Sequence, residues 1–271
     1  MTLRSILFGA CISLLICLSA CFWQDNAQKS VMPSSMCFIV KDIVSGDIIA
    51  KEGDCDTRQT PCSTFKIALS LMGCDAGILK NEREPELPYK QEYNAEFEFW
   101  RQAYTPQLWI KNSCIWYSCE ITARLGMQKF EKYVRDFNYG NGDVSGELGQ
   151  NNGLNRAWLC SSLKISPTEQ IEFIAKLLNF NLPVSCQAYE LTQKLLFVGL
   201  LDNGWRLYGK TGAGIFDGEL KSVAWYVGWV TQEQKTLIFV CLIYGDIDKN
   251  RVNSQLAKEF ALNKLKVVCE K

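Results

Sequence analysis

The 271-residue sequence contains no histidine. This absence excludes the Ser-His-Asp and Cys-His arrangements that activate many hydrolytic nucleophiles, and it excludes zinc sites and general bases that use imidazole. Any nucleophile in the chain must therefore be activated by another side chain. The 13 cysteines include no C-x-x-C pair, so the sequence does not predict a zinc ribbon.

An excess of charge of either sign is also absent. The 29 Lys and Arg residues balance the 29 Asp and Glu residues, and no basic run of five or more residues occurs. The chain therefore lacks the electrostatic attraction to phosphate groups that dominates nucleic-acid binding. What is present is a composition typical of a folded protein, with 48% hydrophobic and 12% aromatic residues. The length suits one large domain or two small ones.

Most of the cysteines are expected to be small buried side chains, which is the usual place of unpaired Cys. Cys37 and Cys55 are a candidate pair, because they flank a predicted hairpin. Whether they form a disulfide is left open by the sequence.

The N-terminus has the pattern of an export signal. Arg4 supplies positive charge, residues 6–18 are apolar or small, and the segment ends in Leu-Ser-Ala before Cys21. We predict a signal peptide over residues 1–20 and a mature chain exported to a periplasm. Cys21 is either the lipidated residue of a bacterial lipoprotein or incidental to ordinary cleavage slightly later. No second apolar segment of the sequence is long enough to span a membrane.

Strand patterns at both ends of the chain enclose a helical middle. Two strands are predicted within residues 36–51, and β-branched and aromatic runs predict three more at 205–211, 222–230 and 236–245. Apolar spacing and capping residues predict helices from residue 63 and over 115–125, 127–137, 167–179, 186–198 and 252–268. The predicted fold is α/β: an antiparallel sheet built from both termini, flanked by helices, with an all-helical region inserted at about 75–185.

One familiar motif is misleading. Residues 204–211 satisfy G-x-x-x-x-G-K-[ST], the phosphate-binding loop of nucleotide-binding proteins. That loop needs small flexible residues followed directly by a helix. Here its interior is Trp-Arg-Leu-Tyr and it is followed by Thr-Gly-Ala-Gly, which predicts a strand and no nucleotide site.

A Ser-x-x-Lys motif begins at Ser63. Lys66 follows one helical turn later, so its amine lies on the same face as the Ser63 hydroxyl. The pair offers a nucleophile, a candidate base and a backbone amide for an oxyanion, without histidine. Alone the motif is weak, and a second copy begins at Ser161 and ends at Lys164.

Two further motifs follow in order. Ser113 opens Ser-Cys-Ile at the start of a predicted helix, and Lys210 opens Lys-Thr-Gly on a predicted strand. Ser-x-x-Lys, then a Ser-x-x element, then Lys-Thr-Gly is the motif order of penicillin-recognising serine enzymes. Three matches in this order are far less expected by chance than any one of them.

With these motifs the chain resembles the class D (oxacillinase-type) β-lactamases. Tyr-Gly-Asn at 139–141 and Trp-Leu at 158–159 extend the resemblance over nearly all of residues 36–268. The second motif departs from the family, since it ends in Ile115 where Val is usual. The class A pattern fits less well, because the Glu-Pro-Glu-Leu at 84–87 precedes the second motif and that motif is not Ser-Asp-Asn. The resemblance implies the β-lactamase-like fold of penicillin-recognising serine enzymes and a catalytic domain over residues 21–271.

The resemblance also implies how a general base arises. Burial of Lys66 favours its neutral amine, which can react with carbon dioxide. The family implies that it does, so the base is a carboxylated lysine stabilised by the indole N–H of Trp158 and by Ile115. Carbon dioxide or bicarbonate is then required, and no metal or other cofactor is expected.

The remaining roles follow from the same resemblance. Ser63 attacks the lactam carbonyl, the backbone amides of Ser63 and Ala213 hold the oxyanion, and Ser113 relays a proton to the leaving nitrogen. Lys210 is also implied as a catalytic residue that keeps the pocket cationic. The substrate is bound by Lys210, Thr211, Gly212 and Arg251. The expected activity is β-lactam hydrolysis, which confers antibiotic resistance.

Several simpler interpretations stay open. Trp158 has an alternative as an ordinary core aromatic, and Arg251 as a surface arginine. Tyr139 and Asn141 have an alternative as turn residues only. A transpeptidase or a β-lactam sensor would acylate without turnover, and a lipoprotein without activity is a third alternative. The range of β-lactams and the oligomeric state are left open.

Overall fold

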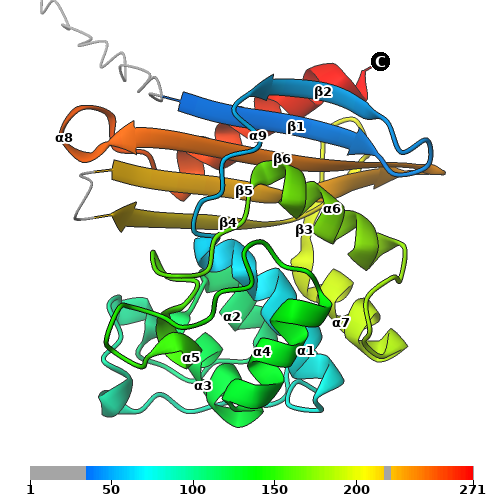
Figure 1. The fold of residues 1–271 in the computed structure, drawn as a ribbon. Helices are drawn as coiled ribbons and strands as arrows, with labels where there is room; N and C mark the ends of the chain where they lie inside the picture. Colours follow the sequence, from blue (N-terminus) through cyan, green and yellow to red (C-terminus); the bar gives the residue numbers. More distant parts are fainter. Residues whose placement is uncertain (1–34, 217–220, 271) are drawn as a thin grey trace, which may run out of the picture. The chain divides into compact units, whose positions relative to one another are not determined.

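The computed structural model describes residues 35–216 and 221–270 (Figure 1). The predicted signal peptide and Cys21 lie outside the described residues. Within the described residues, no helix is both long and apolar enough to cross a membrane.

A six-stranded sheet is the centre of the fold, and every neighbouring pair of strands is antiparallel. The order is β2-β1-β6-β5-β4-β3, with β1 Ser35–Asp42, β2 Ile48–Gly53, β3 Phe197–Leu200, β4 Arg206–Phe216, β5 Lys221–Gln232 and β6 Lys235–Asp246. Because β1 pairs along β6, the two ends of the sequence meet within the sheet. The predicted antiparallel sheet built from both termini is confirmed.

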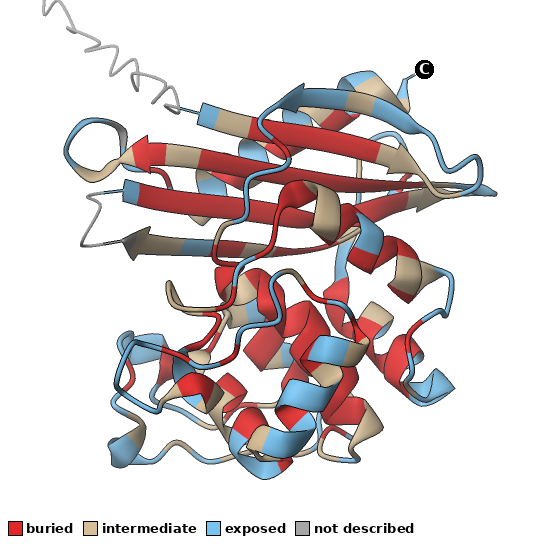
Figure 2. Ribbon diagram, viewed as in Figure 1, coloured by how far each residue is buried: buried red, intermediate tan, exposed pale blue. Residues whose placement is uncertain are grey.

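The central strands are buried on both faces of the sheet, because their successive side chains point alternately to one face and to the other. The described residues form two hydrophobic cores, one on each face of the sheet. In β5, Val223 and Trp225 belong to the first core, which includes the helices between β2 and β3, whereas Ala224 and Tyr226 belong to the second core, on the opposite face. Successive side chains of a strand point to opposite faces, so an apolar run can serve two cores at once. Figure 2 shows the resulting band of buried residues along the central strands.

Helices cover both faces of this sheet (Figure 1). The helix α9 Ser254–Cys269 contacts β4, β5 and β6, with Ala257, Ala261 and Leu265 in the second core. Between β2 and β3 the chain forms α1 Lys66–Asp75, α2 Pro106–Asn112, α3 Ile115–Leu125, α4 Met127–Asp136, α5 Gly153–Arg156, α6 Pro167–Leu178 and α7 Cys186–Leu196. The short helix α8 Ile247–Asn250 follows β6, and single 3₁₀ turns form η1 Cys62–Phe65, η2 Gln91–Tyr93 and η3 Glu98–Trp100.

The helix predicted over 167–179 from its spacing and capping residues is confirmed as α6, and it begins with a capping box. The Ser166 hydroxyl accepts a hydrogen bond from the Glu169 backbone N–H, and the Glu169 carboxylate accepts one from the Ser166 N–H. Both groups would otherwise be unsatisfied at a helix start.

Several element boundaries differ from the prediction by one or more residues, and at two of them the type of element changes. The helix predicted from Ser63 begins as a 3₁₀ turn, and its α-helical part starts at Lys66. The helix predicted to reach residue 198 ends at Leu196, because Phe197 and the residues after it pair with β4 as a strand. Tertiary pairing outweighs local helical spacing at this point.

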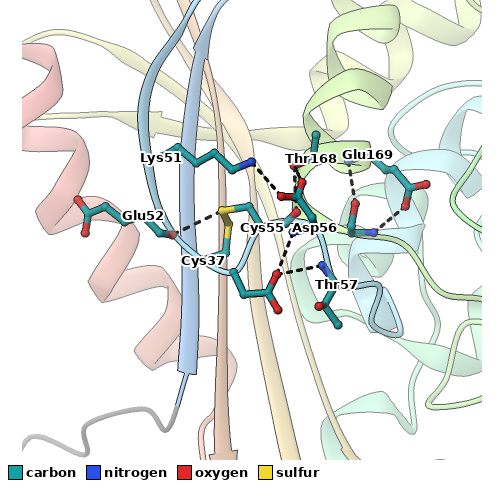
Figure 3. Close-up of a disulfide and its surroundings, with 10 residues drawn as sticks. Cys37, Lys51, Glu52, Cys55, Asp56, Thr57, Thr168 and Glu169 are labelled. Atoms are coloured by element: carbon teal, nitrogen blue, oxygen red, sulfur yellow. Dashed lines mark hydrogen bonds and ion pairs between the residues drawn. A yellow bond between two sulfur atoms is a disulfide. The ribbon is translucent and has the colours of Figure 1, made fainter.

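A disulfide joins Cys37 of β1 to Cys55 (Figure 3). Next to it, the Asp56 carboxylate accepts hydrogen bonds from Lys51 and from Thr168, which also donates from its hydroxyl to the Cys55 carbonyl. The bridge that the sequence left open is therefore formed, and it ties β1 to the segment that leads to η1. Of the other cysteines, Cys62, Cys74, Cys114 and Cys241 are buried as expected, whereas Cys186 is exposed.

Candidate active site

The turn η1 carries Ser63 into contact with Lys66. Ser63 is half-buried, and the Lys66 Nζ donates a hydrogen bond to the Ser63 Oγ at 3.2 Å. The turn is closed by Thr64, whose hydroxyl donates to the Pro61 carbonyl at 2.6 Å. The predicted nucleophile and amine are therefore adjacent, on one turn.

Lys66 has no solvent-exposed surface. Loss of solvation on burial lowers the pKa of Lys66 from 10.5 to about 8, although the nearby thiols of Cys114, Cys119 and Cys62 act in the opposite direction. About one amine in ten is then neutral at pH 7, against about one in 2,500 for a free lysine. The fold thus makes this amine a far better base and nucleophile than a surface lysine.

A second buried lysine approaches from β4. The Lys210 Nζ donates hydrogen bonds to the Ser113 Oγ at 2.5 Å and to the Thr211 carbonyl at 2.9 Å. Ser113 is placed by a left-handed backbone conformation (φ 56°) between α2 and α3. The second and third motifs, roughly 100 residues apart in sequence, are therefore joined by one hydrogen bond.

The positive charges that Lys66 and Lys210 carry when protonated repel each other. Burial, and then the positive charge of Lys66, hold the pKa of Lys210 well below its usual range. Within the described residues, no carboxylate is among the groups that shift the pKa of either lysine. Two buried amines without a nearby carboxylate favour an anion in the site, because an anion would stabilise their protonated forms.

The Lys-Thr-Gly segment of β4 packs directly against the nucleophile turn. A Cβ atom at Gly212 would lie 2.9 Å from the Pro61 carbonyl oxygen and 3.1 Å from the Thr64 nitrogen. Only glycine permits this close approach. Ala213, the next residue, is exposed.

Trp158 is fully buried, and its ring stacks on Phe65 with 5.4 Å between the ring centroids. Among the residues that the structure describes, the buried indole N–H of Trp158 has no hydrogen-bond partner. Such a group costs free energy unless something satisfies it, so it marks a place where a polar group fits. Ile115, at the start of α3, is half-buried and packs against the same core.

Three residues that support the site were not singled out from the sequence. The Thr60 hydroxyl donates to the Trp158 carbonyl and accepts from the Cys160 N–H. The Thr60 carbonyl in turn accepts from the indole N–H of Trp225 on β5. Gln170 donates to the Thr64 hydroxyl and to the Tyr139 hydroxyl. Gln170 had a recognisable signal, since it is a polar residue on the apolar face of a capped helix.

The Tyr-Gly-Asn motif packs against the turn η1 that carries Ser63. Tyr139 is buried edge-on against Phe65, with 5.2 Å between the ring centroids. The Asn141 amide donates to the Ser162 carbonyl and accepts from the Lys164 N–H, so it holds the turn to the segment that follows Trp158. The contacts described for Tyr139 and Asn141 are therefore with other parts of the protein, which hold the turn in place.

Arg251 follows α8 and is exposed, and its side chain takes no part in the hydrogen bonds described above. The second Ser-x-x-Lys motif differs clearly from the first, because Lys164 is exposed whereas Lys66 is buried. Within residues 35–216 and 221–270, no group of three or more cysteine or carboxylate side chains is arranged to hold a metal ion.

Known proteins are similar to this chain in sequence and in fold. Residues 36–263 match the family of the penicillin-binding protein transpeptidase domain. The chain is 34% identical over 265 residues to β-lactamase OXA-9 of Klebsiella pneumoniae, covering 95% of this chain and 96% of that protein. It is 40% identical over 230 residues to β-lactamase OXA-1 of Escherichia coli, covering 83% and 82% of the two chains.

Among solved structures, the crystal structure of the class D β-lactamase OXA-427 superposes with a TM-score of 0.81. It is 39% identical and covers 87% of this chain and 99% of that chain. With the motifs brought together as described, this chain belongs to the class D β-lactamases, hydrolases of β-lactams within the penicillin-binding transpeptidase-domain family.

Proposed function

We propose that the enzyme hydrolyses β-lactams through an acyl-enzyme formed on Ser63. The observation that carries this proposal is the fully buried amine of Lys66, 3.2 Å from the Ser63 hydroxyl, in a chain that has no histidine. A buried amine with a lowered pKa is one of the few remaining ways to activate a serine.

In acylation, the Ser63 oxygen attacks the lactam carbonyl carbon while the Ser63 hydroxyl proton passes to the base at Lys66. The backbone N–H groups of Ser63 and Ala213 stabilise the oxyanion that develops. The C–N bond then breaks, and Ser113 delivers a proton to the leaving nitrogen. The hydrogen bond from Lys210 to Ser113 supports this role, because it orients the hydroxyl. An anionic, carboxylated Lys66 would replace the repelling positive charge and so favour the protonated form of Lys210.

The residues around Lys66 fit a carboxylated form of its side chain. The amine is neutral often enough to react with carbon dioxide. Within the described part of the chain, the indole N–H of Trp158 has no hydrogen-bond partner, and no carboxylate is among the groups that shift the pKa of Lys66 or Lys210. Trp158 would hold the carboxylate by a hydrogen bond, with Ile115 shielding it from water. The added group would supply a general base for acylation and for hydrolysis of the acyl-enzyme.

The positive end of the site suits the carboxylate that penicillins and cephalosporins carry. Lys210, Thr211 and Gly212 would contact it along β4, with Arg251 as a further cationic partner. We also propose that residues 1–20 are a signal peptide, that the catalytic domain spans 21–271, and that the enzyme is periplasmic. The proposal leaves both alternatives for Cys21 open, a lipid anchor on its side chain or ordinary cleavage slightly later.

Turnover of a chromogenic cephalosporin tests the proposed function. We expect the purified enzyme to release product far beyond its own molar amount, because the base next to Ser63 also activates the deacylating water. A single burst equal to the enzyme concentration would instead indicate a transpeptidase or a sensor, which acylates without turnover.

The carboxylated lysine is tested by Trp158→Phe. This change keeps a ring to stack on Phe65 but removes the indole N–H, so we expect kcat to fall about 10–100-fold and to recover partly in added bicarbonate. Removal of carbon dioxide should lower the activity of the wild type reversibly. A ¹³C signal from labelled bicarbonate on Lys66 should weaken in the variant.

Trp109→Phe is the matched control. Trp109 is also fully buried and stacked, on Tyr117, but its N–H donates to the Ser118 hydroxyl and not into the site. The control should lower stability without changing the bicarbonate dependence. Equal bicarbonate dependence in the two variants, or indifference of the wild type to bicarbonate, would contradict the assignment.

A further inference from the structure

Two cysteines that the proposed mechanism does not use lie beside its main residues. Cys62 directly precedes the nucleophile Ser63, and Cys160 is two residues beyond Trp158. Cys62 is 1% exposed, whereas Cys160 is half-buried. Both adopt left-handed backbone conformations, with φ 49° and 55°. Such conformations are uncommon for residues other than glycine and indicate that the surroundings fix each position.

The two sulfur atoms lie over the same glycine of β4. A Cβ atom at Gly214 would lie 2.3 Å from the Cys160 Sγ and 2.8 Å from the Cys62 Sγ. The two thiols also share a hydrogen bond, which is the largest cause of a raised pKa at Cys62. The sulfur atoms therefore occupy one pocket, in contact with each other.

The backbones that carry these thiols are already held together. Thr60, two residues before Cys62, accepts a hydrogen bond from the Cys160 N–H at 3.0 Å and donates to the Trp158 carbonyl at 2.9 Å. Gln59 pairs with Ile165 as an antiparallel bridge on the same two segments. A covalent link between the sulfurs would therefore follow contacts that the fold already makes.

We propose that Cys62 and Cys160 are a second disulfide-forming pair, which links the nucleophile turn covalently to the segment that carries Trp158. The disulfide between Cys37 and Cys55 is the independent sign that this chain meets disulfide-forming conditions. The oxidant is a small disulfide R–S–S–R. The more accessible Cys160 sulfur attacks it and releases one R–SH, and the Cys62 sulfur then displaces the second. Two thiol protons and two electrons pass to R–S–S–R, which leaves as two R–SH.

Oxidised glutathione is the probe for this pair. The full purified enzyme is incubated with and without it, quenched in acid, unfolded, treated with N-ethylmaleimide and digested. We expect a cross-linked peptide that joins Cys62 to Cys160, and a melting temperature higher by about 5–15 °C, because the link closes a loop of roughly 100 residues. The peptide joining Cys37 to Cys55 serves as an internal control in both samples.

Two variants separate this pair from the other cysteines. Cys160→Ser should abolish both the cross-link and the rise in melting temperature, whereas Cys186→Ser, at an exposed position of α7, should leave both unchanged. The proposal is overturned if Cys62 and Cys160 are both alkylated after treatment while the first disulfide is intact. It is equally overturned if Cys160 retains glutathione and Cys62 remains a thiol, since Cys62 would then fail to displace it.

Discussion

Replacing Ser63 by alanine is expected to reduce kcat/KM for a chromogenic cephalosporin by about 10⁴–10⁶-fold, the scale of loss when a nucleophile is removed. The change deletes only the oxygen that accepts the Lys66 hydrogen bond, so the fold should persist. The residual rate would come from binding and from the oxyanion-stabilising amides. Steady-state kinetics, with circular dichroism to confirm folding, measure the effect.

Ser161→Ala is the matched control for this variant. Ser161 begins the other Ser-x-x-Lys sequence, but its partner lysine is exposed and its hydroxyl is buried without a hydrogen bond. Activity should stay within a few-fold of the wild type, and stability should be unchanged or slightly higher. Turnover that persists in Ser63→Ala would remove Ser63 from the mechanism.

The second large effect is expected from Lys66→Met. Methionine fills similar volume in the buried site but has no amine to be carboxylated, so the acyl-enzyme should form slowly and then persist. We expect a loss of at least about 10³-fold in steady-state turnover. Intact-protein mass spectrometry after mixing with substrate should show acylated enzyme that remains after free substrate is removed.

The same variant should be more stable than the wild type. A pKa lowered from 10.5 to about 8 corresponds to a cost of about 3 kcal/mol for holding the charged amine in the folded state. We therefore expect the free energy of unfolding at pH 7, in buffer freed of carbon dioxide, to rise by about 1–3 kcal/mol in Lys66→Met.

The pH dependence has a definite sign. Between pH 8 and 10.5 the folded wild type holds the neutral amine while the unfolded chain still binds the proton, so its stability rises with pH in that window. The advantage of Lys66→Met should shrink accordingly as the pH is raised. Urea unfolding at several pH values tests this, and Lys164→Met, at an exposed lysine, should show neither effect. A constant difference at all pH values would contradict the lowered pKa of Lys66.

The order of strands and helices was largely predictable, because it depends on patterns that are local in sequence. A β-branched and aromatic run such as residues 222–230 predicts a strand whatever its partners, and Ser166 followed by Pro and Glu169 predicts a helix start. Boundaries were less predictable where a distant partner decides them. Phe197 continues a helical pattern but pairs opposite Tyr208 as a strand.

By itself, the sequence determined that no histidine is present, that Ser63 and Lys66 share one turn, and that the three motifs occur in order. These follow from residue identity and helical spacing alone. Packing of distant segments is what buries Lys66 while Lys164 stays exposed, and what joins Lys210 to Ser113 by a hydrogen bond. It also leaves the indole N–H of Trp158 without a hydrogen-bond partner among the described residues. Burial and long-range hydrogen bonds depend on which segments pack together, and that is a property of the whole chain.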